Sequence, residues 1–495
     1  MISSQDDATS CVDVDHCQRA ALPLCVDLDG TLINSNLLWE CIVLLLKDNP
    51  FCLLLVPLWL VTGGRPNLKH QVARRAPLEP NNIPYNRELL EFLKTEHKSG
   101  RQLVLATAAD QQLAEGIAAH TGLFDHVHGT RDGKNLKGRT KADFLRAAFG
   151  NRGFEYAGNS TSDTHVWGFA SGAYVVGSEA TADRAASVTE VRRRFPRRNG
   201  DLKCWARAMR ISHWSKNLLM LVPLLLAHRL SWHSLLMTLL GVVLFGLCSS
   251  GVYIGNDLLD LHSDRAHPWK NGRPFATGEL SIVSGVITSL LLLGVALGLG
   301  ATILNGRFAG ALALYAVIAT WYSLRLKRIA IFDVFVLSSF YSIRIWAGAL
   351  ITGTPLSQWF LGFSLFFFLS LAMAKRYSEL VHAAELADSG NSGHSYRAGD
   401  RELLMTMGMA SCFSAIVILS VYAHSNEVMA LYQRPGLLLL TCPLILYWTC
   451  RIWLKAHRGE LKEDPVILAM QDPVSYCVAA AGLGIILVSS FKLWL

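Results

Sequence analysis

Three aspartates, Asp257, Asp260 and Asp264, stand at the end of a long apolar segment. If this segment stays helical, their i, i+3, i+7 spacing places the three carboxylates on one face. Clustered carboxylates at membrane depth are costly unless positive charge compensates them. Divalent cations such as Mg²⁺ choose carboxylate oxygens and bridge phosphates. The pattern therefore predicts a site for Mg²⁺ and a phosphorylated substrate, and the alternative is three solvated aspartates at a helix end.

A second acidic pair, Asp27 and Asp29, follows a short apolar stretch at 22–26 that is typical of a buried strand. Further strands are predicted at 102–106, which ends at Thr107, at 154–157, which precedes Asp163, and at 173–177. Strands that alternate with helical stretches favour a doubly wound α/β sheet. Ligands bind at the carboxyl ends of the strands in such sheets, so these polar side chains are candidates for a second site.

Composition places both candidate sites in a membrane protein. The 495 residues are 51% hydrophobic and only 17% charged, with a mean hydropathy of +0.30. This profile predicts a polytopic membrane protein with one soluble domain. The net charge of +8 gathers near the expected membrane edges, so membrane topology explains it better than nucleic-acid binding does. Eleven cysteines without a Cys-x-x-Cys pair indicate buried reduced thiols and no disulfide framework.

The sequence Asp27-Leu28-Asp29-Gly30-Thr31 resembles the signature of the haloacid dehalogenase-like (HAD) superfamily, and the later motifs follow in that family's order. The resemblance implies a Mg²⁺-dependent phosphatase. Asp27 would be the nucleophile and Asp29 the general acid/base. Thr107 would hold the transferring phosphoryl group, and Lys141, with Lys137 as the second choice, would neutralise its charge. Asp163 would bind Mg²⁺ with Asp27. Asn159 stands where the family usually has an acid, so the alternative is a HAD fold kept for docking or regulation.

The HAD-like domain is predicted over 21–190, after a polar leader at 1–20 in which we expect no signal peptide. The family inserts a cap between its first two motifs, here at 34–100. Its apolar stretch 37–60 is broken at Lys47-Asp48-Asn49-Pro50, and neither half reaches the ~20 residues that span a bilayer. We therefore expect a helical cap with an apolar face on the membrane or the second domain, and a re-entrant span is the alternative. A basic linker, 191–204, leads to the transmembrane domain, 205–495.

Nine apolar windows predict nine membrane spans, at 216–230, 234–256, 281–302, 307–323, 330–351, 357–375, 403–424, 435–453 and 474–494. The loops after the even-numbered spans carry 14 Lys and Arg residues, and the opposite loops carry only Arg229, Arg307 and Arg434. Because basic loops stay inside, we expect the soluble domain and the aspartates to be cytoplasmic, at the plasma or inner membrane, with the C-terminus outside. Asp333 and Arg344 fall inside the fifth span. Charged residues there are functional candidates, and a structural ion pair is the alternative.

The stretch from Asn256 to Asp264 matches the NDxxDxxxD motif of the UbiA superfamily of intramembrane prenyltransferases. Arg265, His267-Pro268, Lys270 and Arg273-Pro274 follow it as they do in the family. The resemblance covers 205–495 and implies an all-α domain in which the acidic motif binds Mg²⁺ ions that hold a diphosphate. Ordinary members carry a second aspartate motif between the sixth and seventh spans, but this chain has Lys375-Arg376-Tyr377-Ser378-Glu379 there.

The basic second motif, with Lys216-Asn217 and the stretch from Tyr322 to Lys327, resembles the decaprenyl-phosphate phosphoribosyltransferase branch. That branch implies transfer from 5-phosphoribosyl diphosphate to a polyprenyl phosphate, with Mg²⁺ as cofactor and the HAD domain as a candidate phosphatase for the lipid-linked product. The runner-up is transfer of an isoprenyl group from its diphosphate to an aromatic acceptor, and a non-catalytic scaffold or transporter is a third reading. The residues expected to bind substrate are Asn256, Lys270, Arg273, Lys327, Asp333, Arg344, Lys375 and Arg376, with Lys216 as a further candidate.

Overall fold

The computed structural model of the protein describes residues 22–76, 78–131, 133–197, 200–228, 231–267, 270–385, 396–461 and 464–490. The predicted leader, 1–20, lies outside these residues. The chain divides into two units. The first contains the chain up to Ala208 together with Ile254–Ile287, and the second contains Met209–Tyr253 together with Thr288–Leu495. The aspartate motif therefore belongs to the same unit as the HAD-like domain.

The first unit is built on one parallel six-stranded sheet, with strand order β3-β2-β1-β4-β5-β6. Leu24 pairs with Leu103 on one side and with Glu155 on the other, so β1 is central. The predicted α/β fold is confirmed, and all four expected strands are present. The strands are β1 (Leu24–Val26), β2 (Leu103–Asp110), β3 (His126–Thr130), β4 (Glu155–Gly158), β5 (Ala173–Val176) and β6 (Val191–Phe195).

Strand β6 corrects the predicted start of the basic linker at residue 191. Its arginines hid it in the sequence, because a run of charge is typical of an exposed segment. In the structure it is an edge strand beside β5, so Arg193 and Arg194 stay exposed while Phe195 is buried. The basic stretch thus begins as part of the sheet and not as a linker.

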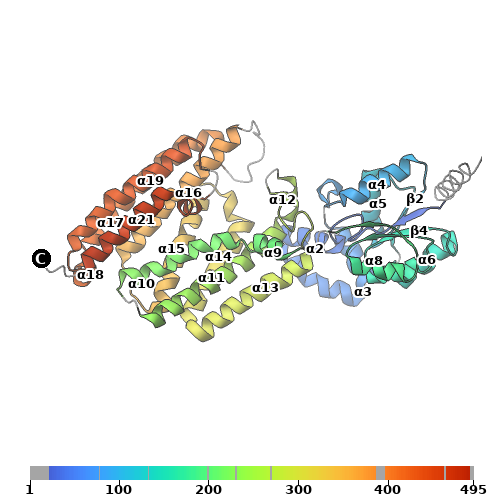
Figure 1. The fold of residues 1–495 in the computed structure, drawn as a ribbon, viewed down its shortest axis with the longest axis horizontal. Helices are drawn as coiled ribbons and strands as arrows, with labels where there is room; N and C mark the ends of the chain where they lie inside the picture. The colour runs from blue at the N-terminus through green and yellow to red at the C-terminus, as the bar shows by residue number, and fades with distance from the viewer. Residues whose placement is uncertain are drawn as a thin grey trace, which may run out of the picture. The chain divides into compact units, whose positions relative to one another are not determined.

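Helices cover both faces of the sheet, as a buried parallel sheet requires. Helices α4 (Arg87–Lys98) and α5 (Gln111–Thr121) pack on one face, through Leu93 and Ile117 against strand residues such as Leu105. The other face is covered by α6 (Arg139–Phe149), α7 (Thr164–Trp167) and α8 (Glu179–Ala186). Figure 1 shows α4 and α5 on one side of β2 and β4, and α6 and α8 on the other.

The expected cap is helical, with α2 (Leu37–Asp48), a short 3₁₀ turn η1 (Pro50–Leu54) and α3 (Leu55–Ala73). Helix α2 ends directly before Asn49 and Pro50, the predicted break. Helix α3 has non-helical backbone at Gly63 and Gly64. Several apolar side chains of this region are exposed, namely Phe51, Leu54, Leu55, Leu58, Leu60 and Val61. Contact between this surface and a bilayer remains a prediction.

The second unit is helical and has its own apolar core. Eight helical segments in the described chain are long and apolar enough to cross a membrane: Trp232–Leu259, Ile282–Leu304, Gly306–Leu324, Phe332–Thr352, Gln358–His382, Ala398–Ala423, Pro435–His457 and Pro473–Ser490. They correspond to the second to ninth predicted windows. Their main helices are α11 (Trp232–Leu259), α13 (Ile282–Leu299), α14 (Gly306–Leu324), α15 (Phe332–Thr352), α16 (Gln358–Glu385), α17 (Arg401–Ala423), α19 (Thr441–His457) and α21 (Pro473–Ser490).

The first predicted span, 216–230, is the exception. It forms the 3₁₀ segment η4 (Ile211–Leu221) and the short helix α10 (Val222–Leu226). Pro223 lies in the first turn of α10, where its missing N–H is tolerated. A proline further inside a helix would break it, so η4 and α10 do not form one continuous helix. Nine full-length spans are therefore corrected to eight among the described residues. The remaining short elements are η2 (Pro80–Asn82), η3 (Thr161–Asp163), α9 (Leu202–Ala208), α12 (Leu261–Ala266), α18 (Asn426–Leu431), α20 (Pro465–Ala469) and η6 (Leu326–Arg328). Three others, η5 (Gly300–Leu304), η7 (Ala398–Asp400) and η8 (Pro435–Leu440), are parts of the eight segments.

Candidate functional site

The aspartate motif lies at the junction of two helices. Helix α11 ends at Leu259, and α12 begins at Leu261. Asp260 lies between them, yet its N–H still donates to the Asn256 carbonyl at 2.9 Å, and the Asp264 N–H donates to the Asp260 carbonyl at 2.8 Å. These i to i−4 hydrogen bonds preserve the helical spacing across the junction. The segment is therefore not one continuous helix. It consists of two consecutive helices, separated at Asp260, that keep nearly the same register.

Two of the three carboxylates converge on one cation. Arg273 Nη1 lies 2.9 Å from Asp257 Oδ1 and 2.6 Å from Asp264 Oδ2. Asp257 and Asp264 are only 4% and 3% exposed. Burial raises the pKa of Asp264, Arg273 opposes that rise, and the charge of Asp257 adds to it. Both carboxylates are therefore placed to share one positive charge.

The third aspartate points to the cap. Asp260 Oδ1 lies 3.2 Å from Lys47 Nζ, at the C-terminal end of α2. About two helical turns before Lys47 on α2, the fully buried carboxylate of Glu40 accepts two hydrogen bonds from the guanidinium of Arg265, at 2.8 and 3.1 Å. His262 Nε2 lies 3.2 Å from the same carboxylate. The cap and the aspartate motif are thus joined within the first unit by Glu40 and Lys47, and no sequence pattern marks either residue as functional.

The motif's donor set suits a divalent cation. Among the described residues, no group of three His, Cys, Asp or Glu side chains is arranged as a metal site. However, the Arg273 nitrogen shows that Asp257 and Asp264 can hold a single positive charge between them. Their oxygen atoms are the ligand type that Mg²⁺ prefers. Asp257 and Asp264 would hold such an ion once Arg273 moves its guanidinium to another anion. Asp260 would join them as a third ligand once it leaves Lys47.

The HAD-like residues lie together at the carboxyl ends of neighbouring strands. Asp27 follows β1, Thr107 is in β2, and Asp163 follows β4. Lys141 Nζ, near the start of α6, lies 2.7 Å from Asp27 Oδ1, whereas Lys137 is exposed. The fully buried Thr107 hydroxyl accepts a hydrogen bond from Ala109 N at 3.0 Å. All the residues that the family resemblance selects are thus placed near one edge of the sheet.

Tyr156, which the sequence analysis did not select, links these groups. Lys141 Nζ donates to its hydroxyl at 2.9 Å, and this hydroxyl donates to Asp163 Oδ1 at 3.1 Å. The other oxygen of Asp163 accepts from the backbone N–H groups of Asn159 and Ser160, at 3.1 and 2.8 Å. Asp27 and Asp163 are both buried carboxylates, so their oxygens also suit a divalent cation. Tyrosine on an apolar strand looks like a core residue in sequence, and no pattern marked its hydroxyl.

The pKa values of the two acids differ from those of exposed aspartates. Burial raises the pKa of Asp29 to about 6, and the hydrogen bond from Leu37 N, at 2.9 Å, limits the rise. Burial also raises the pKa of Asp27, and the positive charge of Lys141 limits this rise. A carboxyl group with a pKa near 6 can give and take a proton near neutral pH. The environment of Asp29 therefore suits a general acid/base.

In the second unit, basic residues from two expected positions meet at Asp464. Lys216 Nζ lies 2.8 Å from Asp464 Oδ2, and Lys375 Nζ lies 3.6 Å from the same oxygen. The Tyr341 hydroxyl donates to this carboxylate at 2.9 Å. Lys216 is nine-tenths buried, and Lys375 is half-buried. Asp464 was missed because it lies in a short polar loop, where an aspartate before a proline is typical of a helix N-cap.

Asp333 and Arg344, predicted on one helix face, have separate partners. Asp333 Oδ2 accepts from Arg376 Nε at 2.7 Å, and Arg376 also donates to the Tyr322 hydroxyl at 2.7 Å. Arg344 Nε donates to Asn217 Oδ1 at 2.9 Å, and its guanidinium faces the rings of Phe245, Tyr315 and Tyr341. The Asp333–Arg344 ion pair that was the alternative does not form in the structure. Both residues are buried, as is Arg376, which pairs with protein groups.

The remaining candidates are less enclosed. Asn256, Lys270 and Lys327 are half-buried, the first at the end of α11, the second in the loop after α12 and the third in η6.

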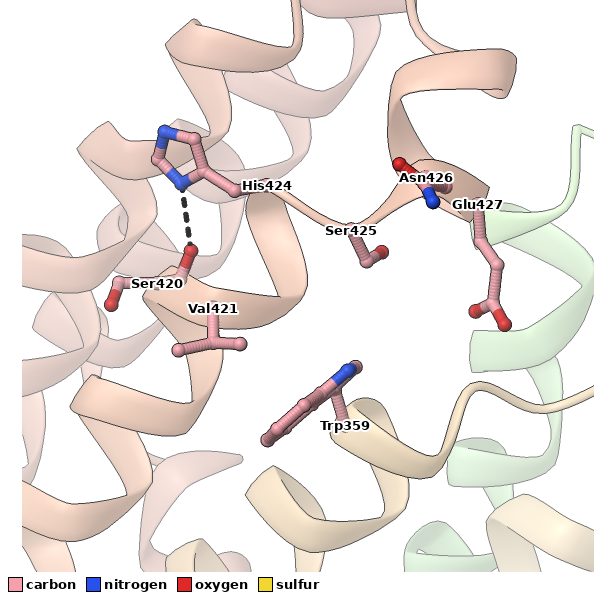
Figure 2. Close-up of a pocket in the computed structure, with 7 residues that line it drawn as sticks. All are labelled: Trp359, Ser420, Val421, His424, Ser425, Asn426 and Glu427. Carbon is pink, nitrogen blue, oxygen red and sulfur yellow. Dashed lines mark hydrogen bonds between the residues drawn. The ribbon is translucent and has the colours of Figure 1, made fainter.

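A separate cavity of about 620 Å³ is lined by Trp359, Ser420, Val421, His424, Ser425, Asn426 and Glu427 (Figure 2). Trp359 is in the first turn of α16, and Lys375 lies about 24 Å further along the same helix at about 1.5 Å per residue. This cavity therefore contains none of the predicted site residues.

Comparisons with known proteins match the chain in two parts. The model of the UbiA prenyltransferase family matches residues 218–464, and the model of the haloacid dehalogenase-like hydrolases matches residues 24–166. The uncharacterized protein y4nM of Sinorhizobium fredii is 38% identical over 475 residues, which are 95% of this chain and 91% of that protein. Both domains are thus shared with a relative along nearly the whole chain.

Two further similarities concern the membrane domain. The decaprenyl-phosphate phosphoribosyltransferase of Mycobacterium tuberculosis is 36% identical over 184 residues, which are 36% of this chain and 60% of that enzyme. A solved structure of a UbiA homolog from Archaeoglobus fulgidus, bound to GPP and Mg²⁺, is 18% identical with a TM-score of 0.44, covering 57% of this chain and 99% of that one. The chain belongs to the UbiA prenyltransferase family and carries a haloacid dehalogenase-like hydrolase domain in its N-terminal part.

Proposed function

We propose that the UbiA-type domain transfers phosphoribosyl from 5-phosphoribosyl diphosphate to a polyprenyl phosphate. The observation that carries this proposal is the pair of lysines, Lys216 and Lys375, at the carboxylate of Asp464. Lys375 belongs to the stretch that replaces the second acidic motif of ordinary family members. Two ammonium groups there suit a co-substrate that carries phosphate better than an aromatic one. The similarity to decaprenyl-phosphate phosphoribosyltransferases supports the same donor and acceptor.

The reaction asks little of the chain in acid–base chemistry. A phosphate acceptor is already ionised at neutral pH, so its oxygen attacks ribose C1 without a general base. The bond from C1 to the diphosphate breaks as the new C–O bond forms. Catalysis then consists of positioning and of charge stabilisation.

The residues divide these tasks. Asp257, Asp260 and Asp264 would hold Mg²⁺, which when bound would neutralise the leaving diphosphate. Arg273 would exchange its two carboxylates for phosphate oxygens, and Lys270 and Lys327 are further candidates for phosphate contacts. Lys216 and Lys375 would supply positive charge for phosphate in place of Asp464. Arg344, Asp333 and Arg376 have buried protein partners, so we assign them to holding the helices in register.

For the HAD-like domain we propose removal of the 5-phosphate from the lipid-linked ribose 5-phosphate. Asp27 attacks the phosphorus, and the ester bond to the sugar oxygen breaks. Asp29 gives its proton to that oxygen, then takes a proton from the water that hydrolyses the aspartyl-phosphate. Lys141 stabilises the charge on the transferring group, and Thr107 positions that group. Asp163, with Asp27, would hold Mg²⁺, which when bound would add positive charge beside the phosphate. The distance between Lys141 and Asp27 supports these roles, as does the raised pKa of Asp29.

A partition assay tests the transferase. The purified full chain, in detergent with Mg²⁺, receives ribose-labelled 5-phosphoribosyl diphosphate and polyprenyl phosphate. We expect label in the organic phase, and Asp257→Asn should remove at least 99% of it. Asp183→Asn changes an exposed aspartate on α8 and is the matched control. Label that stays in water, while a prenyl diphosphate is consumed with an aromatic acid, would instead establish the prenyl-transfer alternative.

A further inference from the structure

A cavity of about 210 Å³ lies beside the general acid/base of the HAD-like site. Asp29, Asn159 and Arg197 line its polar side. Its apolar lining comes from the segment after the aspartate motif, through Phe275, Leu280, Ile282 and Val283, and from Trp39 on α2. All of these residues belong to the first unit. A UbiA-type sequence segment thus completes a cavity of the phosphatase domain.

The apolar wall is fixed in place by close backbone contacts. Gly278 has a φ of +76°, and a Cβ there would come within 2.6 Å of the Asn34 carbonyl oxygen. A Cβ at Gly200 would lie 2.1 Å from Leu280 Cδ2, and the Gly200 N–H donates to the Glu279 carbonyl at 3.2 Å. Gly278 is needed because the backbone at Asn34 approaches it without room for a side chain. At Gly200 the side chain of Leu280 would have to move to admit a Cβ. The segment is therefore part of the domain's packed structure.

The polar side faces the leaving group of the proposed reaction. Asp29 protonates the ester oxygen, so the group that departs with that oxygen must lie on the side of Asp29. Arg197 is on this side, and its Nη2 donates to the Asn34 carbonyl at 3.0 Å. A guanidinium has five N–H donors in a planar fork, which suits phosphate oxygens. The cavity is smaller than a typical drug-sized pocket of about 300 Å³ or more, so it suits a sugar with its linking phosphate and not a whole lipid.

We propose that this cavity binds the leaving group of a lipid-linked sugar phosphate, with Arg197 on the phosphodiester between sugar and lipid. Val283 and Leu280 then contact the first isoprene unit. This inference rests on the proposed function and adds its substrate recognition. A soluble phosphate monoester has neither a diester nor a lipid, so it uses neither contact. The phosphatase should therefore distinguish the two substrates through residues outside the reacting centre.

The test uses the full chain in detergent and supplies preformed polyprenyl-phosphoryl-ribose 5-phosphate, so no transferase activity is needed. Phosphate release is compared with that from p-nitrophenyl phosphate. Arg197→Gln and Val283→Asp should each lower the ratio of the two kcat/KM values at least tenfold. Arg87→Gln, an exposed arginine on α4, is the matched control and should keep the wild-type ratio. A ratio that stays at the wild-type value, whether or not both kcat/KM values fall, would overturn the proposal.

A binding measurement separates this inference from the proposed phosphatase. The Asp27→Asn chain cannot form the aspartyl-phosphate, so its affinity for the lipid-linked substrate is read without turnover. Adding Arg197→Gln should weaken this binding at least tenfold. If the wild-type protein releases no phosphate but Arg197→Gln still weakens binding, the proposed phosphatase activity is wrong and the proposed binding site is supported. Equal affinity with and without Arg197 would refute the binding site, even if the wild type is an active phosphatase.

Discussion

The carboxylate of Glu40 on the cap helix α2 accepts two hydrogen bonds from Arg265, 225 residues further along the chain. Arg265 also donates to the carbonyl groups of Asn82 and Ala276, at 2.9 Å each. The residue follows the aspartate motif directly, so the cap, the motif and the loop after it share one guanidinium. Because this ion pair is buried, removing either partner would leave the other charge without a counter-ion in the protein interior.

Removing one partner of this pair should therefore be costly. We expect Glu40→Gln to destabilise the first unit by about 3–5 kcal/mol, because it leaves the Arg265 charge buried without its counter-ion. Thermal unfolding of the purified protein measures the loss. Glu88→Gln, on the exposed face of α4, is the control. Equal melting temperatures for the two variants would show that the ion pair does not stabilise the fold.

The same pair has a pH signature. Burial opposes ionisation of Glu40, but His262 and Arg265 outweigh it and lower its pKa to about 2 from the usual 4.5. A carboxyl group with a lowered folded-state pKa stabilises the protein above its unfolded-state pKa. The contribution is thus complete above about pH 4.5 and falls as the pH drops toward 2. The stability difference between wild type and Glu40→Gln should shrink across that range, and a constant difference would contradict the assignment.

The raised pKa of Asp29 predicts how the proposed phosphatase activity depends on pH. With its pKa raised to about 6, the fraction that can donate a proton falls tenfold per pH unit above that value. Formation of the aspartyl-phosphate from a sugar phosphate, measured by acid quench, should decline in the same way. A phosphate ester with 2,4-dinitrophenol needs no proton on its leaving group, so its rate should not decline. A decline with both substrates would assign the effect to another group.

The position of Arg273 between Asp257 and Asp264 predicts competition with a metal ion. In Arg273→Gln the two carboxylates lose their resident cation, so Mn²⁺ should bind several-fold more tightly by electron paramagnetic resonance. Transfer activity should nevertheless fall at least tenfold, because no guanidinium remains at position 273 to contact the substrate phosphate. Weaker Mn²⁺ binding in this variant would mean that Arg273 organises the carboxylates and does not compete for them.

The lysines at Asp464 predict an effect on the phosphate-bearing substrates. Lys375→Met should lower kcat/KM for polyprenyl phosphate at least tenfold, since one positive charge is lost at the proposed phosphate contact. Lys203→Met removes an exposed lysine and serves as the control. If the two variants have the same kcat/KM, the ion pair with Asp464 is structural and the basic second motif no longer argues for a phosphate acceptor.

Local patterns were enough to predict both fold classes, and they selected acidic residues that the structure places near one another in each candidate site. The DxDGT signature located Asp27 and Asp29, and apolar length located eight of the helical segments. Partners distant in sequence were not predictable. Glu40, Tyr156 and Asp464 look like an amphipathic helix residue, a strand residue and a helix cap, and only the folded chain brings them to Arg265, Lys141 and Lys216. Strand β6 was hidden because its arginines mask its period.

One experiment tests the central claim most directly. Phosphoribosyl diphosphate labelled with ¹⁴C in the ribose and ³²P in the 5-phosphate is given to the purified full chain with polyprenyl phosphate and Mg²⁺. We predict that ¹⁴C enters the lipid phase and that ³²P then leaves it as inorganic phosphate. Asp27→Asn should keep both labels in the lipid at equal ratio. Absence of ¹⁴C from the lipid phase, with wild-type protein that is folded and binds Mn²⁺, would contradict phosphoribosyl transfer.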